Sequence, residues 1–150
     1  MINLIRTDST NTDFIFLVNM LDADLAIRDG SDHSFYQQFN SVVSIKNVVV
    51  AYVEDRPVSC GAFKEFAAAA AEVKRMYTLT EFRGKGIASI VLNELEQWGR
   101  ELSYSRFVLE TGKKQPEAIR LYEKNGYHVI SNYEQYIGVE NSICFEKNLL

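Results

Sequence analysis

A short glycine-containing segment, which joins a strand-like run to a long amphipathic helix, constrains this chain more than any other feature. The segment, called here the glycine turn, is Arg83-Gly84-Lys85-Gly86-Ile87-Ala88, and the run before it extends from Glu72 to Thr80. After it, apolar residues recur at helical spacing: Ile87, Val91, Leu95, Trp98 and Leu102. Free backbone N–H groups and the helix dipole favour an anion at such a helix start, and glycines let the anion approach the backbone. The sequence therefore predicts a phosphate-binding site at the glycine turn.

The charge around the glycine turn differs from that of the whole chain. The 150 residues carry 16 Lys and Arg against 20 Asp and Glu, a net charge of −4, which argues against a general nucleic-acid-binding protein. Between residues 74 and 85, four basic residues against one acidic residue give +3. A dinucleotide-binding fingerprint would need a third glycine where Ser89 stands, and the Gly-Lys-Ser/Thr of a nucleotide-triphosphate loop is absent. From these residues alone, a solvated basic turn remains the alternative to a phosphate site.

The rest of the chain alternates short strand-like runs with amphipathic helices. Strands are predicted at residues 2–7, 48–53, 58–66, 72–80, 106–111, 127–130 and 143–147, and helices at 12–27, 34–39, 87–102 and 116–124. A turn is predicted at residues 55–57. The five alanines Ala67–Ala71 are too few to nucleate a helix and are assigned to a hairpin loop. Because no repeat or linker divides residues 1–150, one mixed α/β domain is expected.

Cysteine usage and hydropathy predict a soluble cytoplasmic protein. The longest apolar runs, such as Val48–Val53, are much shorter than the about 20 residues that cross a bilayer, and the N-terminus lacks a signal-peptide layout. Cys60 and Cys144 are expected to be buried free thiols. His33 and His128 are assigned to turns or the surface, and no metal site is expected because the cysteines and histidines do not cluster.

Residues 72–130 resemble the GNAT superfamily of acyl-CoA-dependent N-acetyltransferases. The family's phosphate motif, Gln/Arg-x-x-Gly-x-Gly/Ala, is matched by Arg83, Gly86 and Ala88. Further matches follow in order: Leu109-Glu110-Thr111-Gly112, Ala118-Ile119, Leu121-Tyr122-Glu123-Lys124 and Gly126-Tyr127. The resemblance implies one N-acetyltransferase domain over residues 1–150. Its mixed α/β fold would be a predominantly antiparallel sheet flanked by helices, in the order β-α-α-β-β-β-α-β-α-β-β.

The resemblance also implies acetyl-CoA as the cosubstrate. Its pyrophosphate would bind backbone N–H groups of Arg83, Gly84, Lys85, Gly86, Ile87 and Ala88, with the Ser89 hydroxyl as an additional contact. The pantetheine arm would lie along Met76, Tyr77 and Thr78, and that strand would separate from residues 106–111 to make room. Gln115 stands where many relatives have an asparagine that contacts the cofactor.

Two catalytic residues are implied in the same way. Attack of an amine on a thioester needs a base, an oxyanion donor and a proton for the leaving thiolate. Glu72 stands where some relatives place a catalytic glutamate, although a water chain can replace a direct base. Tyr122 aligns with the tyrosine that protonates the CoA sulfur, and a backbone N–H near Tyr77 with the oxyanion donor. The structural alternatives are an ion-paired residue at a strand end for Glu72 and a core residue for Tyr122.

The acceptor is expected to be a primary amine of a small molecule or peptide. In this fold the first helices and the loop between the last two strands usually form the acceptor side. Those segments carry acidic residues and tyrosines here: Asp22, Asp24, Asp29, Asp32, Glu134, Glu140, Tyr133 and Tyr136. Such an entrance would favour a cationic amine, although an ordinary solvated surface is the alternative. Tyr136 and Glu110 are predicted to contact the acceptor, and Glu110 could equally be a structural carboxylate.

Two functions compete at this stage. One is a working N-acetyltransferase that acts by direct attack in a ternary complex, and the other is a catalytically silent acyl-CoA-binding regulatory module. The presence of both Glu72 and Tyr122 favours the enzyme, since a binding module needs neither. Transfer to a hydroxyl, or of a longer acyl group, is a third alternative. No nucleic-acid or membrane partner is expected, and a homodimer and a monomer both remain open.

Overall fold

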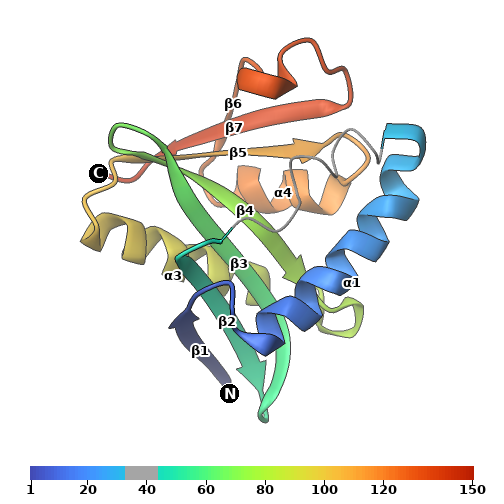
Figure 1. Cartoon of the computed structure of the whole chain (residues 1–150), viewed down its shortest axis with the longest axis vertical. Helices are drawn as coiled ribbons and strands as arrows, with labels where there is room; N and C mark the ends of the chain where they lie inside the picture. Colours follow the sequence, from blue (N-terminus) through green and yellow to red (C-terminus); the bar gives the residue numbers. More distant parts are fainter. Residues whose placement is uncertain (33–43) are drawn as a thin grey trace.

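A twisted sheet runs through the computed structural model, which describes residues 1–32 and 44–150 (Figure 1). Within those residues, seven strands form one sheet in the order β1-β2-β3-β4-β5-β7-β6. The strands are β1 (Ile2–Thr7), β2 (Asn47–Val53), β3 (Arg56–Ala67), β4 (Ala70–Thr78), β5 (Arg106–Gly112), β6 (His128–Ile130) and β7 (Ser142–Asn148). All neighbours pair antiparallel except β4 and β5, which are parallel. The mixed α/β, mainly antiparallel fold predicted from the sequence is confirmed.

Helices cover both faces of this sheet. They are α1 (Thr12–Asp29), α3 (Ile87–Glu101) and α4 (Pro116–Lys124), with 3₁₀ turns at Gly30–Asp32, Thr80–Phe82 and Glu134–Tyr136. Consecutive β2 residues from Val48 to Ala51 are fully buried, which requires cover on both faces, and α1 and α3 both pack on β2–β4 (Figure 1). None of the helices in the described residues is long and apolar enough to cross a membrane. The helix predicted at 34–39, and His33, lie outside the described residues.

Two predicted turns differ from the observed ones. The alanine run is not a five-residue loop: Ala67 ends β3, Ala70 and Ala71 begin β4 in fully buried positions, and the turn is limited to residues 68–69. The hairpin closes because Ala67 pairs with Ala70 while Ala69 adopts a left-handed φ of 59°. Likewise, the turn predicted at residues 55–57 consists of Glu54 and Asp55, both with positive φ, and β3 already begins at Arg56.

The pairing of β4 with β5 creates the opening that positions the site. These strands pair over three residue pairs, from Ala70 with Arg106 to Glu72 with Val108. Beyond this point β4 continues to Thr78 and β5 to Gly112 without pairing to each other. The other edge of β5 pairs with β7 along its whole length. The predicted separation of the two strands is therefore confirmed, and within residues 1–32 and 44–150 no strand pairs with this edge of β4 beyond Glu72.

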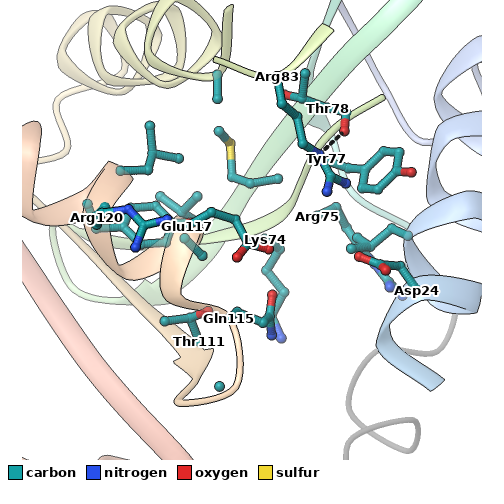
Figure 2. A pocket seen from close by; sticks show the side chains of 18 of the residues that line it. Asp24, Lys74, Arg75, Tyr77, Thr78, Arg83, Thr111, Gln115, Glu117 and Arg120 are labelled. Atoms are coloured by element: carbon teal, nitrogen blue, oxygen red, sulfur yellow. Dashed lines mark hydrogen bonds between the residues drawn. The ribbon is translucent and has the colours of Figure 1, made fainter. Parts of the chain in front are cut away.

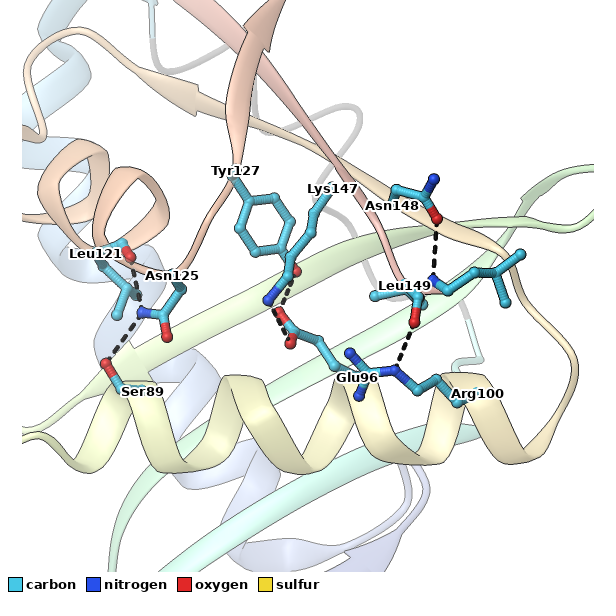
Figure 3. A network of polar contacts seen from close by, with 10 residues as sticks. Ser89, Glu96, Arg100, Leu121, Asn125, Tyr127, Lys147, Asn148 and Leu149 are labelled. Carbon is cyan, nitrogen blue, oxygen red and sulfur yellow. Dashed lines mark hydrogen bonds and ion pairs between the residues drawn. The ribbon is translucent and has the colours of Figure 1, made fainter.

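A buried polar network fastens α3 to the last two strands (Figure 3). The Glu96 side chain, 2% exposed, accepts hydrogen bonds from the Tyr127 hydroxyl (2.8 Å) and from Lys147 Nζ (2.9 Å). Nearby, Arg100 Nε donates to the Leu149 carbonyl at 2.7 Å. These contacts join a helix to strands that are distant in sequence, and they fix α3 against the sheet.

Replacing Glu96 with alanine should lower the free energy of unfolding by about 3 kcal/mol, because a buried phenol and an ammonium lose their partner together. Chemical denaturation measures this loss. The matched control is Glu94→Ala, which removes the partly exposed ion pair with Arg6 (2.7 Å) and should cost at most about 1 kcal/mol. Equal losses in the two variants would show that the buried network contributes no more than a surface pair.

Candidate active site

The opening between β4 and β5 leads into a cavity of about 610 Å³, a size usual for small-molecule sites (Figure 2). Its wall comes from β4, the glycine turn, the start of α3, the end of β5, α4 and the C-terminal part of α1. Most of the predicted site residues line it: Glu72, Met76, Tyr77, Thr78, Arg83, Gly84, Gly86, Ile87, Ala88, Ser89, Glu110, Gln115, Tyr122 and Tyr136. Lys85 does not, and its Nζ instead lies 5.6 Å from the centre of the Phe82 ring.

Most residues of the glycine turn line this cavity. Gly84 and Gly86 have φ values of 78° and 80°, and a Cβ added at either would meet no atom within 4 Å. Gly86 is the N-cap of α3, so the first N–H groups of the helix have no intrahelical acceptor. Arg83 Nε donates to the Thr78 carbonyl at 2.8 Å, which ties the turn to the end of β4. The turn thus combines open space, free donors and positive charge, the requirements for binding a pyrophosphate.

Ser89 is held by a contact from α4. Its hydroxyl accepts a hydrogen bond from Asn125 Nδ2 at 3.1 Å, and the same Nδ2 donates to the Leu121 carbonyl at 2.8 Å (Figure 3). The amide therefore connects the C-terminal end of α4 to the first turn of α3. This contact joins two helices that both contribute residues to the cavity wall.

Tyr122 projects from α4 into a nearly closed environment. Its side chain is 6% exposed, and its ring lies 5.6 Å from that of Tyr127 and 5.9 Å from that of Phe145. Burial, assisted by the negative charge of Glu110, raises the pKa of Tyr122 above that of an ordinary phenol. The hydroxyl consequently keeps its proton at neutral pH, as a proton donor must.

Glu72 is the last residue of β4 that pairs with β5, and it is 4% exposed. Both of its carboxylate oxygens are engaged: Oε2 accepts a hydrogen bond from the Tyr133 hydroxyl at 2.6 Å, and Oε1 is 3.6 Å from Lys74 Nζ. The ion pair agrees with the structural alternative, although Glu72 lies within β4 and not at the strand end. The two partners leave Glu72 less available to accept a substrate proton.

Glu110 has a different environment, although it also lines the cavity. Its Oε2 is buried and has no hydrogen-bond partner among the described residues. Burial raises the pKa of Glu110 to about 7, against the opposing effects of a hydrogen bond with Ser142 and the charge of Lys74. A carboxyl group with a pKa near neutrality, in a cavity, can accept and release a proton under physiological conditions.

Sequence reasoning missed several charged residues of the cavity wall. Lys74 and Arg75 line it from β4, and Arg75 is ion-paired with Asp22 at 3.0 Å. Three charged residues of α4 also line it: Glu117, Arg120 and Lys124. Their spacing of three and four positions places them on one helical face, a signal that was available in the sequence. Arg28 of α1 forms ion pairs with both Asp24 and Glu117, which links α1 to α4 across the cavity.

The predicted acidic, tyrosine-lined entrance forms only in part. Asp24, Asp29 and Tyr136 line the cavity, whereas Glu134 and Glu140 do not. The cysteines are both buried, as predicted. Within the part of the chain that the structure describes, no three His, Cys, Asp or Glu side chains are grouped so that they could hold a metal ion.

Comparisons with known proteins agree with this geometry. Residues 16–127 match the sequence model of the acetyltransferase (GNAT) family. The chain is 32% identical over 101 residues to the uncharacterized N-acetyltransferase YsnE of Bacillus subtilis, covering 66% of this chain and 67% of that protein. It is 43% identical over 60 residues to the uncharacterized N-acetyltransferase YjgM of Escherichia coli, covering 39% of this chain and 35% of that protein.

Solved structures show the same fold. A candidate acyl-CoA N-acyltransferase from Klebsiella pneumoniae superposes with a TM-score of 0.84 at 26% identity, covering 100% of this chain and 99% of that one. The PaiA N-acetyltransferase of Thermoplasma acidophilum, solved with coenzyme A, gives a TM-score of 0.72 at 16% identity, covering 99% of each chain. Because the family model spans most of the sequence, the chain belongs to the acetyltransferase (GNAT) family. The family predicted from the glycine turn and the residues after it is confirmed.

Proposed function

We propose that this acetyltransferase moves an acetyl group from acetyl-CoA to a primary amine of a small molecule or peptide, by direct attack in a ternary complex. One observation carries the proposal: residues of the glycine turn line the same cavity as Glu110 and Tyr122. The free edge of β4 lies between them. Fold neighbours solved with coenzyme A, or with acetyl-coenzyme A in the case of a Bacillus anthracis protein, support this cosubstrate.

The cosubstrate would contact three parts of the chain. Backbone N–H groups of the glycine turn would hold the pyrophosphate, and the open space at Gly84 and Gly86 fits its close approach. The residues from Met76 to Thr78 would receive the pantetheine arm on the free edge of β4, as if it were an added strand. Gln115 lines the same cavity and would offer its side-chain amide.

The chemical step then needs three groups of this chain. Glu110 would accept the proton of the acceptor ammonium, which frees the nitrogen lone pair to attack the thioester carbon. Free backbone N–H groups on the edge of β4 would stabilise the oxyanion. As the C–S bond breaks, Tyr122 would donate its proton to the departing sulfur, and the second proton that the amide nitrogen loses would restore the tyrosine hydroxyl. In this account Glu72, the base implied by resemblance, instead holds Lys74 and Tyr133 in place.

Binding is the first test. Acetyl-CoA at about 100 times its Kd should raise the Tm by about 5–10 °C, because a ligand that binds the folded state alone stabilises it. Differential scanning calorimetry measures the shift, with adenosine as a control ligand that lacks the pyrophosphate and pantetheine. No shift at saturating acetyl-CoA would refute the cosubstrate assignment.

Replacing Tyr122 with phenylalanine should lower kcat on the order of 10²-fold, since the leaving thiolate loses its proton donor while the ring contacts remain. Affinity for acetyl-CoA should not change. The control is Tyr104→Phe, because Tyr104 does not line the cavity. An unchanged kcat for Tyr122→Phe, measured where chemistry limits the rate, would return Tyr122 to a packing role.

A further inference from the structure

Two side chains of opposite charge occupy equivalent positions on either side of the opening between β4 and β5. The last parallel pair is Glu72 with Val108. Beyond it the strands separate, and Lys74 and Glu110 are each two residues further along their own strand. Side chains two residues apart on a strand share a face. Both residues line the cavity, and each affects the pKa of the other through its charge.

Neither group has all of its hydrogen bonds within the part of the chain that the structure describes, although Lys74 is ion-paired with Glu72. Within residues 1–32 and 44–150, no ion pair joins Lys74 to Glu110, and no group accepts a hydrogen bond from Lys74 Nζ. The contact of Lys74 with Glu72, at 3.6 Å, is longer than a hydrogen bond. Glu110 Oε2 likewise has no hydrogen-bond partner among those residues. Burying an ionised group costs free energy when its hydrogen bonds are not all made, and a ligand of opposite charge that makes them would lower this cost.

Two of the other cations near the cavity, Arg75 and Arg28, are already paired with carboxylates. Arg75 is paired with Asp22 at 3.0 Å, and Arg28 is paired with Asp24 and Glu117. Lys74, in contrast, lines the cavity with an ammonium that donates no hydrogen bond within the described residues, so its donors are available to a ligand. The Lys74 side chain is 10% exposed, and its burial lowers the pKa of the ammonium. An anionic ligand beside the ammonium would raise that pKa again.

We infer that the acceptor is a small zwitterion of the amino-acid type, whose ammonium faces Glu110 and whose carboxylate faces Lys74. This inference rests on the proposed transfer to an amine. One charged group at each side of the opening orients the amine toward the thioester. Because Glu110 would take the ammonium proton, the carboxylate contact with Lys74 holds the acceptor in place while its nitrogen becomes neutral. A polyamine or a lysine side chain in a peptide would offer Lys74 no carboxylate and would add a second positive charge beside it.

The test compares acceptors that differ in the carboxylate alone. α-Amino acids are assayed by release of the CoA thiol, each against its primary amide and against the amine that lacks the carboxyl group, together with β-alanine, γ-aminobutyrate and spermidine. The kcat/KM for the best free amino acid should exceed that of its amide and its decarboxylated amine by roughly 10- to 100-fold. Equal or better turnover of amides, simple amines or spermidine would overturn the inference while leaving the proposed transfer intact.

Variants separate carboxylate recognition from general damage. Lys74→Met should raise KM for the amino acid by roughly tenfold or more and leave KM for the decarboxylated amine unchanged. Lys114→Met, a cation outside the cavity wall, should alter neither value. A Lys74 variant that raises KM equally for both acceptors would contradict the contact, provided that acetyl-CoA still raises its Tm. Absence of thiol release with every acceptor, despite acetyl-CoA binding, would refute the proposed function itself.

Discussion

Replacing Glu110 with glutamine should lower kcat by about 10²- to 10⁴-fold, the contribution of a well-placed general base. The amide has nearly the same shape as the acid and can still receive the Ser142 hydrogen bond through its oxygen, but it cannot accept a proton. The affinity for acetyl-CoA should stay unchanged, since the glycine turn is untouched. Steady-state kinetics with a saturating acceptor, together with calorimetric binding of acetyl-CoA, measure both quantities.

The pH profile gives a second readout of the same residue. Because burial raises the pKa of Glu110 to about 7, its carboxylate form predominates above that pH. The kcat/KM of the native enzyme should therefore rise as pH increases through about 7 and fall as Glu110 is protonated below it. This limb should disappear in Glu110→Gln. A limb of the same midpoint in the variant would assign the titration to another group.

Glu72→Gln is the comparison that decides between the two carboxylates. The new amide would retain an oxygen for the Tyr133 hydroxyl, but the charge beside Lys74 would be lost. We expect a smaller loss in kcat than for Glu110→Gln, with the rise in activity near neutral pH preserved. A larger loss in the Glu72 variant, with loss of that rise, would make Glu72 the base, as the family resemblance implies.

Replacing Gly86 with glutamate should weaken acetyl-CoA binding by about 10²-fold or more. The new carboxylate would occupy the proposed pyrophosphate position at the start of α3 and would repel the pyrophosphate by its charge. Gly86 has a φ of 80°, which is unfavourable for a side chain, and its missing Cβ leaves open space at the start of α3. Isothermal titration calorimetry with acetyl-CoA measures the change directly.

Gly138→Glu provides a matched control for that variant. Gly138 has a φ of 79°, and a Cβ there would also meet no atom within 4 Å, but the residue does not line the cavity. The backbone strain and the added charge are thus the same. Affinity should remain native in Gly138→Glu, and an equal loss in both variants would argue against a phosphate site at the glycine turn.

Features that depend on neighbours in sequence could be predicted well. The apolar stripe formed by Ile87, Val91 and Leu95 identifies α3, and these three residues are buried as expected. The glycine turn could be recognised because a helix start, two glycines and basic residues are all local. The structure of the alanine run could not be predicted in this way. Propensity alone does not show that Ala67 pairs with Ala70, or that the alanines belong to the two strands of a hairpin.

The roles of the two glutamates depend on contacts far apart in the sequence. Glu72 is engaged by Tyr133, 61 residues away, and no local pattern predicts that hydrogen bond. The juxtaposition of Lys74 and Glu110 follows from the parallel register of β4 and β5, which becomes visible only once those strands are paired. Sequence analysis could therefore find the carboxylates of the site, whereas their different environments required the fold.

The most direct test of the central claim is to identify the product formed from isotopically labelled acetyl-CoA and an amine acceptor. Mass spectrometry of the reaction should show one labelled acetyl group on the acceptor nitrogen. The acetylated amine and free CoA should form in equal amounts, and both should decrease together in Glu110→Gln. Binding of acetyl-CoA without any acetylated amine, or release of CoA with free acetate as the sole product, would contradict the account.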